Sequence, residues 1–322
     1  MFQQIASFFF MLNLLFNSLF CLPLNRYDSM ELFSDDDFSD GFFVISQETV
    51  NGQAQQLGSF TYSNESSVPS WAIAQWSSGP CLWADRIESD EYTITDGTTK
   101  TVTYNPQEGS VSMRLNAANV YNGSAATYES WPHLLLEQAP LTDYSKLTEE
   151  EKEFYFCTAD EFVLDLKIRM TDFKYTTNPE GVNAVQFLAY FYLQGLSGNE
   201  FIWFGVDLFD SRGYSDTNWS YDKGSGNMIY CLSTKDTYGL KTRSLYRFGK
   251  PYISEEWTTV KVNLKPHLEK AIKLANKDNI FGKEVSLEDF YIGGTNIGFE
   301  IHGNYDCTIE IKDFNITSYK KK

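Results

Sequence analysis

Cysteine, proline, histidine and basic residues are scarce in this chain of 322 residues, which contains 5 Cys, 9 Pro and 3 His. No C-x-x-C pair occurs, so zinc ribbons and thioredoxin-like redox sites have no basis in the sequence. The 26 basic residues are outnumbered by 43 acidic ones, which gives a formal net charge of −17. Because such a surface repels phosphate backbones and no basic stripe is present, we expect no nucleic-acid partner.

Several catalytic and metal-binding signatures are also missing. The chain has no G-x-S-x-G elbow, no P-loop, no H-E-x-x-H and no G-x-G-x-x-G. The acidic segment 35–40 does not fit an EF-hand, because Phe38 stands at the third loop position counted from Asp36. We therefore expect no cofactor and no catalytic metal; a structural calcium ion is compatible with these residues but is not indicated by them.

Long apolar runs are absent except near the start, where residues 5–20 are IASFFFMLNLLFNSLF. This run is short for a membrane span and is followed by polar residues, so it predicts a signal peptide over residues 1–21. An uncleaved anchor is the alternative, since no Lys or Arg precedes the run. We expect an extracellular protein, secreted or at the cell surface, with no membrane span after signal removal.

Export has two consequences for particular residues. An oxidising compartment favours two disulfides among Cys81, Cys157, Cys231 and Cys307, with three possible connectivities, and four unpaired buried thiols are the alternative. N-x-[S/T] sequons mark candidate glycosylation sites, which should lie on the surface. They are Asn64, Asn122, Asn218 and Asn315.

Aromatic residues and short alternating segments are abundant. The chain contains 20 Tyr, 25 Phe and 7 Trp, which suit β-sheets. In EFVLDLKIRM, residues 161–170, every second residue from Phe162 to Met170 is apolar, as in a strand with one wet side. Two strands flank Asp96-Gly97, a hairpin signal. Segments 184–193 and 201–209 are apolar on both faces, as in central strands.

Helix signals are few. A capping box formed by Thr148 and Glu151 predicts one short helix, and residues 265–277 predict another, with Pro266 at the start. The pattern therefore indicates an all-β fold: a single large antiparallel β-sandwich of jelly-roll type with one or two short helices. We expect it to span residues 42–319, after an acidic and mobile lead-in over 22–41. A two-domain division near residues 140–160 is the alternative.

The segment SWPHLLLEQ, residues 130–138, carries the best candidate for chemistry. In a strand, Trp131, His133 and Glu137 share one face, and His133 and Glu137 would remain neighbours in a helix. An imidazole beside a carboxylate can act as a general acid or base. The alternative is a purely structural hydrogen bond between His133 and Glu137.

Two further strands carry polar side chains beside glycines. Trp203 and Asp207 alternate around Gly205, and the gap above a glycine would leave room for a ligand. In GGTNIGFEIHG, residues 293–303, Asn296, Glu300 and His302 share a face with another glycine. Carboxylates in apolar strands need a partner or an opening to water, so these segments predict a polar site.

The segments WPHLLLEQ, WFGVDLFDSRG and YIGGTNIGFEIHG together resemble a group of uncharacterised secreted jelly-roll proteins. This resemblance spans about residues 70–318 and implies one domain, with no assigned residues. More loosely, the chain is similar to concanavalin A-like carbohydrate-active proteins, whose grooves combine Trp, Asn and carboxylates. The E-x-D-x-x-E motif of family 16-type β-glucanases is absent, which counts against an enzyme of that kind.

We therefore expect a secreted protein that binds an extracellular glycan or polysaccharide on an aromatic and acidic face. The expected binding residues are Trp71, Trp131, Trp203, Asp207, Asn296 and His302. The first alternative is a polysaccharide hydrolase or lyase, with Glu137 or Glu300 as acid/base and His133 assisting. The second is a structural surface protein without a ligand.

Overall fold

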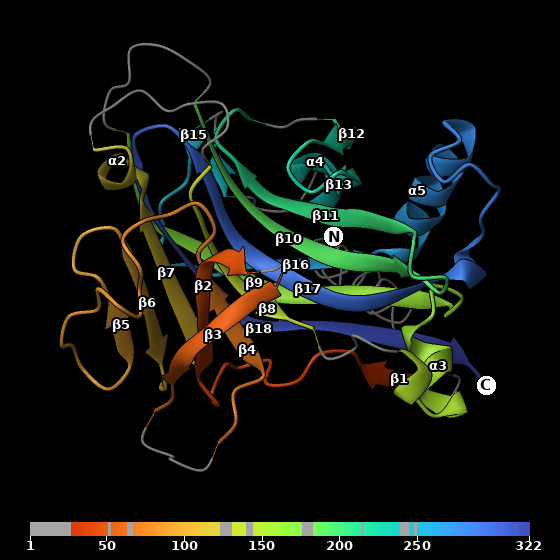
Figure 1. Cartoon of the computed structure of the whole chain (residues 1–322), viewed down its shortest axis with the longest axis horizontal. Helices are drawn as coiled ribbons and strands as arrows, with labels where there is room; N and C mark the ends of the chain where they lie inside the picture. The colour runs from red at the N-terminus through yellow and green to blue at the C-terminus, as the bar shows by residue number, and fades with distance from the viewer. Residues whose placement is uncertain are drawn as a thin grey trace, which may run out of the picture.

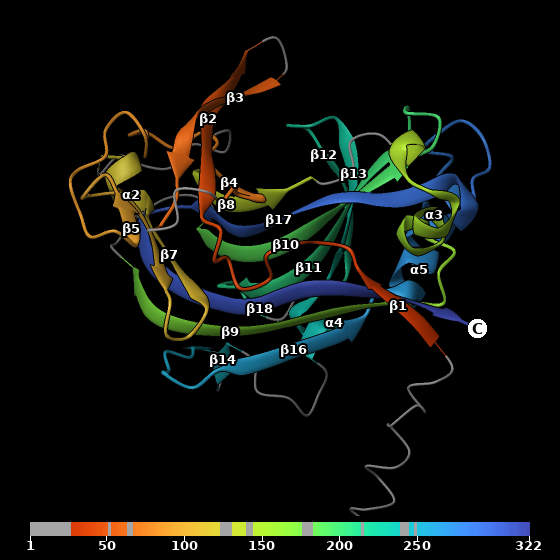
Figure 2. The same ribbon diagram turned by 90° about the horizontal axis from the view of Figure 1, so that it is seen from below.

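Two β-sheets are stacked face to face in the computed structural model (Figure 1). It describes residues 27–50, 53–62, 67–122, 131–139, 144–175, 183–213, 216–238, 245–247 and 250–322. The predicted signal peptide over residues 1–21 and the sequon at Asn64 lie outside these ranges. Figure 2 shows one sheet, with β17, β10 and β11, lying over the other, with β18 and β9. The predicted β-sandwich is confirmed.

The nine-stranded sheet is mostly antiparallel, but β2 and β4 are parallel, as are β11 and β13. In spatial order it contains β12 (Asn218–Asp222), β13 (Asn227–Leu232), β11 (Phe201–Asp210), β10 (Ala184–Gly195), β17 (Phe290–His302), β8 (His133–Gln138), β4 (Trp71–Ala74), β2 (Phe42–Val50) and β3 (Gln53–Phe60).

The seven-stranded sheet is antiparallel throughout. Its spatial order is β16 (Thr258–Asn263), β9 (Glu161–Tyr175), β18 (Tyr305–Lys321), β7 (Ser110–Asn116), β6 (Lys100–Asn105) and β5 (Thr93–Thr95), and β1 (Tyr27–Glu31) pairs with the end of β18. The hairpin predicted at Asp96-Gly97 is the β5–β6 connection. A third, two-stranded sheet pairs β14 (Tyr246–Arg247) with β15 (Lys250–Pro251).

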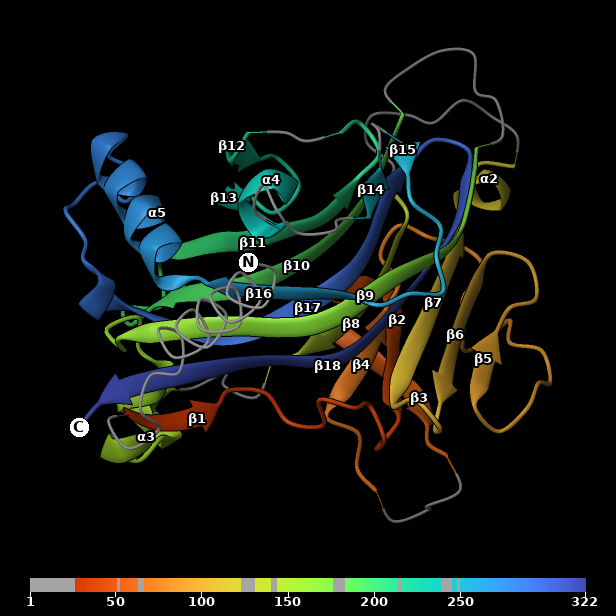
Figure 3. The same ribbon diagram turned by 180° about the vertical axis from the view of Figure 1, so that it is seen from behind.

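Four α-helices occur in the described part of the chain, two more than expected. They are α2 (Ala117–Val120), α3 (Glu149–Tyr155), α4 (Thr234–Tyr238) and α5 (Lys265–Lys277), and single 3-10 turns are η2 (Tyr144–Lys146) and η3 (Leu287–Asp289). The predicted capping box of α3 and the bounds of α5 are confirmed. Figure 3 shows α5 at one end of the sandwich. None of the described helices is long and apolar enough to cross a membrane.

Alternating apolar residues of both sheets meet in one core. On β9, the five residues predicted to share a face, from Phe162 to Met170, are all fully buried. The opposing layer includes Phe187 and Phe191 of β10 and Phe299 of β17. Burying side chains of this size is the main favourable contribution to folding. The core thus leaves the alternate residues of β8, β10, β11 and β17 on the outer face of the nine-stranded sheet.

The acidic lead-in is not a mobile linker over its described part. Residues Tyr27–Glu31 form β1, which pairs with Thr317–Lys321 of β18, and Phe38 is fully buried. The Phe38 ring lies 5.3 Å from that of Trp71, measured between centroids. The prediction rested on the acidic composition of the segment and overlooked its few apolar residues. Burial of these residues holds the segment against the sandwich.

The predicted disulfides are wrong for this structure. Cys81, Cys157, Cys231 and Cys307 are all free thiols. Cys231 lies on β13 of one sheet and Cys307 on β18 of the other, whereas the remaining two lie outside the strands. Burial raises the pKa of Cys157 to about 12, so that thiol is unreactive at ordinary pH. The sequon asparagines were expected on the surface. Asn122 and Asn218 are exposed, as expected, but Asn315 is only 7% exposed within β18.

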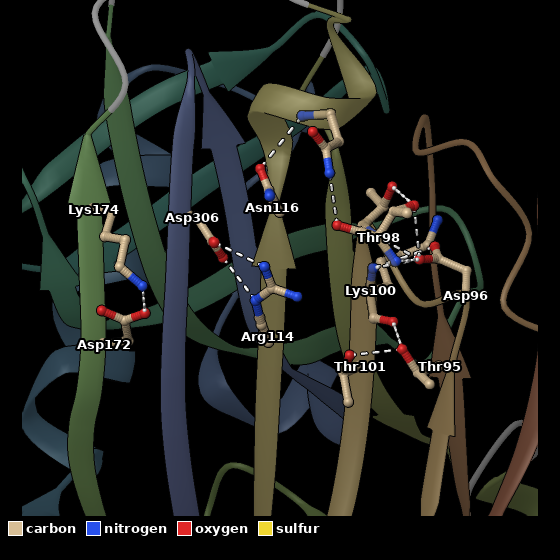
Figure 4. A network of polar contacts seen from close by, with 12 residues as sticks. Thr95, Asp96, Thr98, Lys100, Thr101, Arg114, Asn116, Asp172, Lys174 and Asp306 are labelled. Carbon is tan, nitrogen blue, oxygen red and sulfur yellow. Dashed lines mark hydrogen bonds and ion pairs between the residues drawn. The ribbon is translucent and has the colours of Figure 1, made fainter. Parts of the chain in front are cut away.

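One charged side chain points into the interior between the sheets. Lys100 begins β6 and is fully buried, on the same face as Val102 and Tyr104. Its Nζ donates hydrogen bonds to the carbonyl oxygen of Ser78 and, at 3.1 Å, to Ser78 Oγ. The Lys100 backbone N–H donates to Asp96 in the β5–β6 turn (Figure 4). Burial lowers the pKa of the Lys100 ammonium to about 8.

Candidate functional site

The outer face of the nine-stranded sheet carries polar and aromatic side chains from five adjacent strands, β13, β11, β10, β17 and β8. The pairing register arranges them in rows across the sheet. One row contains Cys231, Gly205, Tyr190, Asn296 and Glu137. A parallel row contains Asp210, Gln186, Glu300 and His133. The row between them contains Asp207, Leu188, Gly298 and Leu135. Glu137, Glu300 and Asp207 therefore share this face.

A β-bulge at the end of β11 sets the position of the two aspartates. Leu188 pairs with Asp207 and Phe187 with Phe209, so Leu208 is the extra residue. A bulge reverses the alternation beyond it, and Asp210 therefore joins Asp207 on the outer face. Asp210 receives hydrogen bonds from Gln186 Nε2 at 3.1 Å and from the Arg212 guanidinium, at 2.9 Å from Nε to Oδ1.

Asp207 is held differently: the backbone N–H of Phe209 donates a hydrogen bond to its carboxyl group. The residue is 3% exposed, and its Oδ1 has no hydrogen-bond partner. Burial and the neighbouring Asp210 raise the pKa of Asp207 well above its ordinary value, and the charge of Arg212 only partly opposes this. A raised pKa favours the protonated form of a carboxyl group, which can donate as well as accept a hydrogen bond.

His133 is held between a carboxylate and a carbonyl. Its Nε2 lies 3.8 Å from Glu300 Oε2, and its Nδ1 lies 3.3 Å from the backbone oxygen of Trp76. Because a carbonyl only accepts, Nδ1 carries a proton and Nε2 faces Glu300. Burial lowers the pKa of His133, but Glu300, the Trp76 carbonyl and Glu137 outweigh burial, and the net shift is upward. The imidazolium ion therefore persists to higher pH than in a free histidine.

Glu137 also contacts Trp76, through the indole ring. Trp76 Nε1 donates a hydrogen bond of 3.0 Å to Glu137 Oε1. Burial raises the pKa of Glu137, although the indole and His133 act in the opposite direction. Glu137 and Glu300 thus differ in their surroundings: one accepts from a neutral indole, and the other lies beside an imidazole. Carboxyl groups placed in different surroundings are typical of acid/base sites.

An aromatic cluster on β10 and β11 lies on the same face as these carboxyl groups. The Trp203 ring lies 4.8 Å from Phe201, 5.2 Å from Tyr192 and 5.9 Å from Tyr190, all edge-on. Trp203 Nε1 donates to Ser225 Oγ in the β12–β13 turn at 2.9 Å, which fixes the plane of the indole. The four side chains, Tyr190, Tyr192, Phe201 and Trp203, are partly exposed. We call them the aromatic cluster.

Glycine makes room for the ring of Tyr190. A Cβ atom on Gly205 would lie 2.5 Å from Tyr190 Cε1 and 2.9 Å from Cys231 Sγ. The ring therefore lies against the bare backbone of β11. Burial is the main cause of the raised pKa of Tyr190, and Cys231, Glu300 and Asp207 add to it. The gap predicted above Gly205 is thus filled by a tyrosine from the neighbouring strand, not left open for a ligand.

The remaining predicted residues lie at the margin of this face or outside it. Trp131 stacks near His302, with 5.0 Å between ring centroids, and His302 is 2% exposed. Trp71 is fully buried in the core, where its Nε1 donates to the Asp35 carbonyl at 2.9 Å. The expectation that Trp71 stacks on a ligand is therefore wrong, because its side chain faces the other sheet.

Three contributors were missed from the sequence. Trp76 lies beyond the end of β4, and only the fold brings it beside β8. Tyr190 and Tyr192 lie in a strand that is apolar on both faces, so alternation did not distinguish them from core residues. The spacing of two tyrosines on one face of that strand was the available signal.

The side chains on this face can bind an uncharged ring of a ligand and can exchange protons with it. The carboxyl groups and His133 supply acids and bases, and the aromatic cluster supplies a flat apolar surface. Among the residues within the described ranges, no group of three or more His, Cys, Asp or Glu is arranged to hold a metal ion.

Comparisons with known proteins concern the fold. The sequence matches no protein-family model, and no curated protein matches it either. The solved structures that it resembles include a native family 12 xyloglucanase from Bacillus licheniformis, with 10% identity and a TM-score of 0.38 over 76% of this chain and 99% of that one. The xyloglucanase domain of NopAA from Sinorhizobium fredii has 12% identity and a TM-score of 0.34, over 78% and 98%. Endoglucanase 3 from Trichoderma harzianum, of family GH12, has 8% identity and a TM-score of 0.34, over 79% and 91%. These likenesses are too distant to assign any residue.

Proposed function

We propose that the protein is exported and binds an extracellular glycan on the outer face of the nine-stranded sheet. The observation that carries this proposal is the aromatic cluster on the same face as Asn296, Glu137 and Glu300, with Tyr190 opposite Asn296 and Asn296 opposite Glu137. Sugar rings present flat apolar faces and a rim of hydroxyl groups, so they pair with exposed rings and with nearby polar side chains. The export signal predicted at residues 1–21 supports an extracellular ligand.

Replacing Trp203 by alanine should weaken glycan binding about 30-fold, because a central aromatic contact is worth about 2 kcal/mol. The measurement is a glycan array followed by calorimetry on the best ligand. Trp257→Ala is the matched control, since Trp257 is also partly exposed but packs against Arg169 and Lys312 of the seven-stranded sheet. Equal affinities for the Trp203→Ala variant and the wild type would remove the basis of the proposal.

Hydrolysis or elimination on the same face is the second candidate. It is favoured by the raised pKa of Glu137 and by the His133–Glu300 pair. The register counts against it: Glu137 is opposite Asn296, so Glu300 lies four residues along, about 13 Å between α-carbons. Glycosidase carboxyl groups stand about 5 to 9.5 Å apart, so these two side chains would have to lean toward each other. We therefore place binding first.

A polysaccharide-degradation screen separates the two candidates. If the protein is an enzyme, Glu137→Gln and Glu300→Gln should each lower the rate by about 100-fold or more while glycan binding persists. Product release measured by reducing-end assay is the readout. Absence of product from every polymer, with binding intact, would eliminate the hydrolase.

A further inference from the structure

Positive charge is segregated between the two large sheets. The nine strands of the nine-stranded sheet contain neither lysine nor arginine. All such residues in the strands of the two large sheets belong to the seven-stranded one: Lys100, Arg114, Lys167, Arg169, Lys174, Lys261, Lys312, Lys320 and Lys321. An entire sheet without a fixed cation presents an acidic field to an approaching ligand.

Acidic side chains differ in their ion pairing between the two sheets. On the seven-stranded sheet most of them are paired: for example, Arg114 Nη2 lies 2.8 Å from Asp306, and Lys174 contacts Asp172 (Figure 4). On the outer face of the nine-stranded sheet, Arg212 is engaged by Asp210. No lysine or arginine of the described chain forms an ion pair with Glu137, Asp207 or Glu300. Among the described residues, His133 is the one basic side chain within ion-pair distance of Glu300.

Two buried oxygen atoms on this face also have no donor. Asn296 is 6% exposed and Asp207 is 3% exposed, and Oδ1 of each has no hydrogen-bond partner. The Asn296 side chain hydrogen-bonds the hydroxyl of Tyr192, and Asn296 lies beside Glu137 across the sheet. A buried acceptor without a donor costs about 1 to 3 kcal/mol, so a ligand that brings donors gains affinity here.

We infer, on the basis of the proposed function, that the face takes a glycan bearing free amines, such as a deacetylated hexosamine polymer, and rejects polyuronates. An ammonium group supplies three donors and a positive charge, which fits unpaired carboxyl groups and orphan acceptors together. A uronate or sulfate ester would meet only like charge and no arginine fork. The aromatic cluster favours a flat sugar ring over a basic peptide as the carrier of the amines.

The test compares β-linked glucosamine oligomers with the same oligomers after N-acetylation, which removes the charge at constant chain length. Oligogalacturonate and oligolysine complete the set, and titration calorimetry on the full protein is done at a pH where the amines are protonated. We expect the free amine to bind about tenfold or more tightly than the acetylated form, with added salt reducing this advantage. We expect no measurable binding of oligogalacturonate.

Two variants test which carboxylate is responsible for the preference for the free amine. Glu137→Gln keeps an acceptor for Trp76 and should lose most of the preference for the amine while retaining affinity for the acetylated oligomer. Asp165→Asn removes a carboxylate paired with Lys261 on the other sheet and should leave the preference unchanged. Equal binding of both oligomers would overturn this inference and leave the proposed function standing. Binding of oligolysine as tightly as the sugar amine would also overturn it. Failure of every glycan to bind would overturn the proposed function itself.

Discussion

Gly298→Ala should destabilise the protein by about 3 kcal/mol and abolish glycan binding. A Cβ atom at this position would lie 2.2 Å from the carbonyl oxygen of Leu134 and 2.8 Å from the α-carbon of Leu135. Both obstacles are backbone atoms, which cannot rotate away as a side chain can. The substitution would force β17 away from β8, and these strands carry Glu300, His133 and Glu137.

Urea denaturation and glycan calorimetry measure the two effects of Gly298→Ala. The control is Gly224→Ala in the β12–β13 turn, where the nearest atom to a new Cβ is Asp222 Oδ1 at 3.4 Å. We expect this control to change stability by less than about 0.5 kcal/mol. Wild-type stability in the Gly298→Ala variant would show that β17 and β8 can separate at little cost, against the geometry described above.

Stability should rise with pH through the titration of Lys100. The folded protein releases the Lys100 proton near pH 8, whereas the unfolded chain keeps it up to about 10.5. Between these values the unfolded state binds more protons, so the free energy of unfolding increases with pH. The expected increase is about 3 kcal/mol, from the difference between the two pKa values. Below pH 8 the buried ammonium weakens the fold.

The measurement is the difference in unfolding free energy between the wild type and Lys100→Met, followed from about pH 7 to 10. Other titrating groups occur in both proteins and cancel in this difference. Lys167→Met is the control, since Lys167 is partly exposed and paired with Asp313 at 2.7 Å. A flat difference for Lys100→Met across this range would mean that the Lys100 ammonium keeps its proton in the folded state.

The alternation of apolar and polar residues along single strands predicted the strands and their buried faces, which are features that local sequence can determine. The segment 133–138 is a strand with Leu134 and Leu136 inward and His133 and Glu137 outward, as its pattern indicates. Helix α5 has the predicted bounds, because Pro266 and the spaced apolar residues specify its start and its buried face. These features depend on neighbours within a few residues.

Features that depend on pairing between distant strands were not predictable in this way. The bulge at Leu208 places Asp210 on the outer face, and nothing in the local pattern of β11 specifies it. Trp71 lies in WAIA, which is apolar on both faces, so its direction follows only from the parallel pairing with β2. Lys100 has a core position that alternation alone would give to an apolar residue, and its partner Ser78 comes from a separate loop.

The position of β17 and β18 in the two sheets bears on how the chain folds. Both strands come later in the sequence than the strands that flank them. In its sheet, β17 lies between β10 and β8, and β18 lies between β9 and β7. Neither sheet is complete until these two strands, one in each sheet, have been synthesised, and contacts so distant in sequence make folding slow. Until β17 is present, β10 and β8 each have an unpaired edge. Loss of these two strands would therefore divide both sheets at once, each at an interior position.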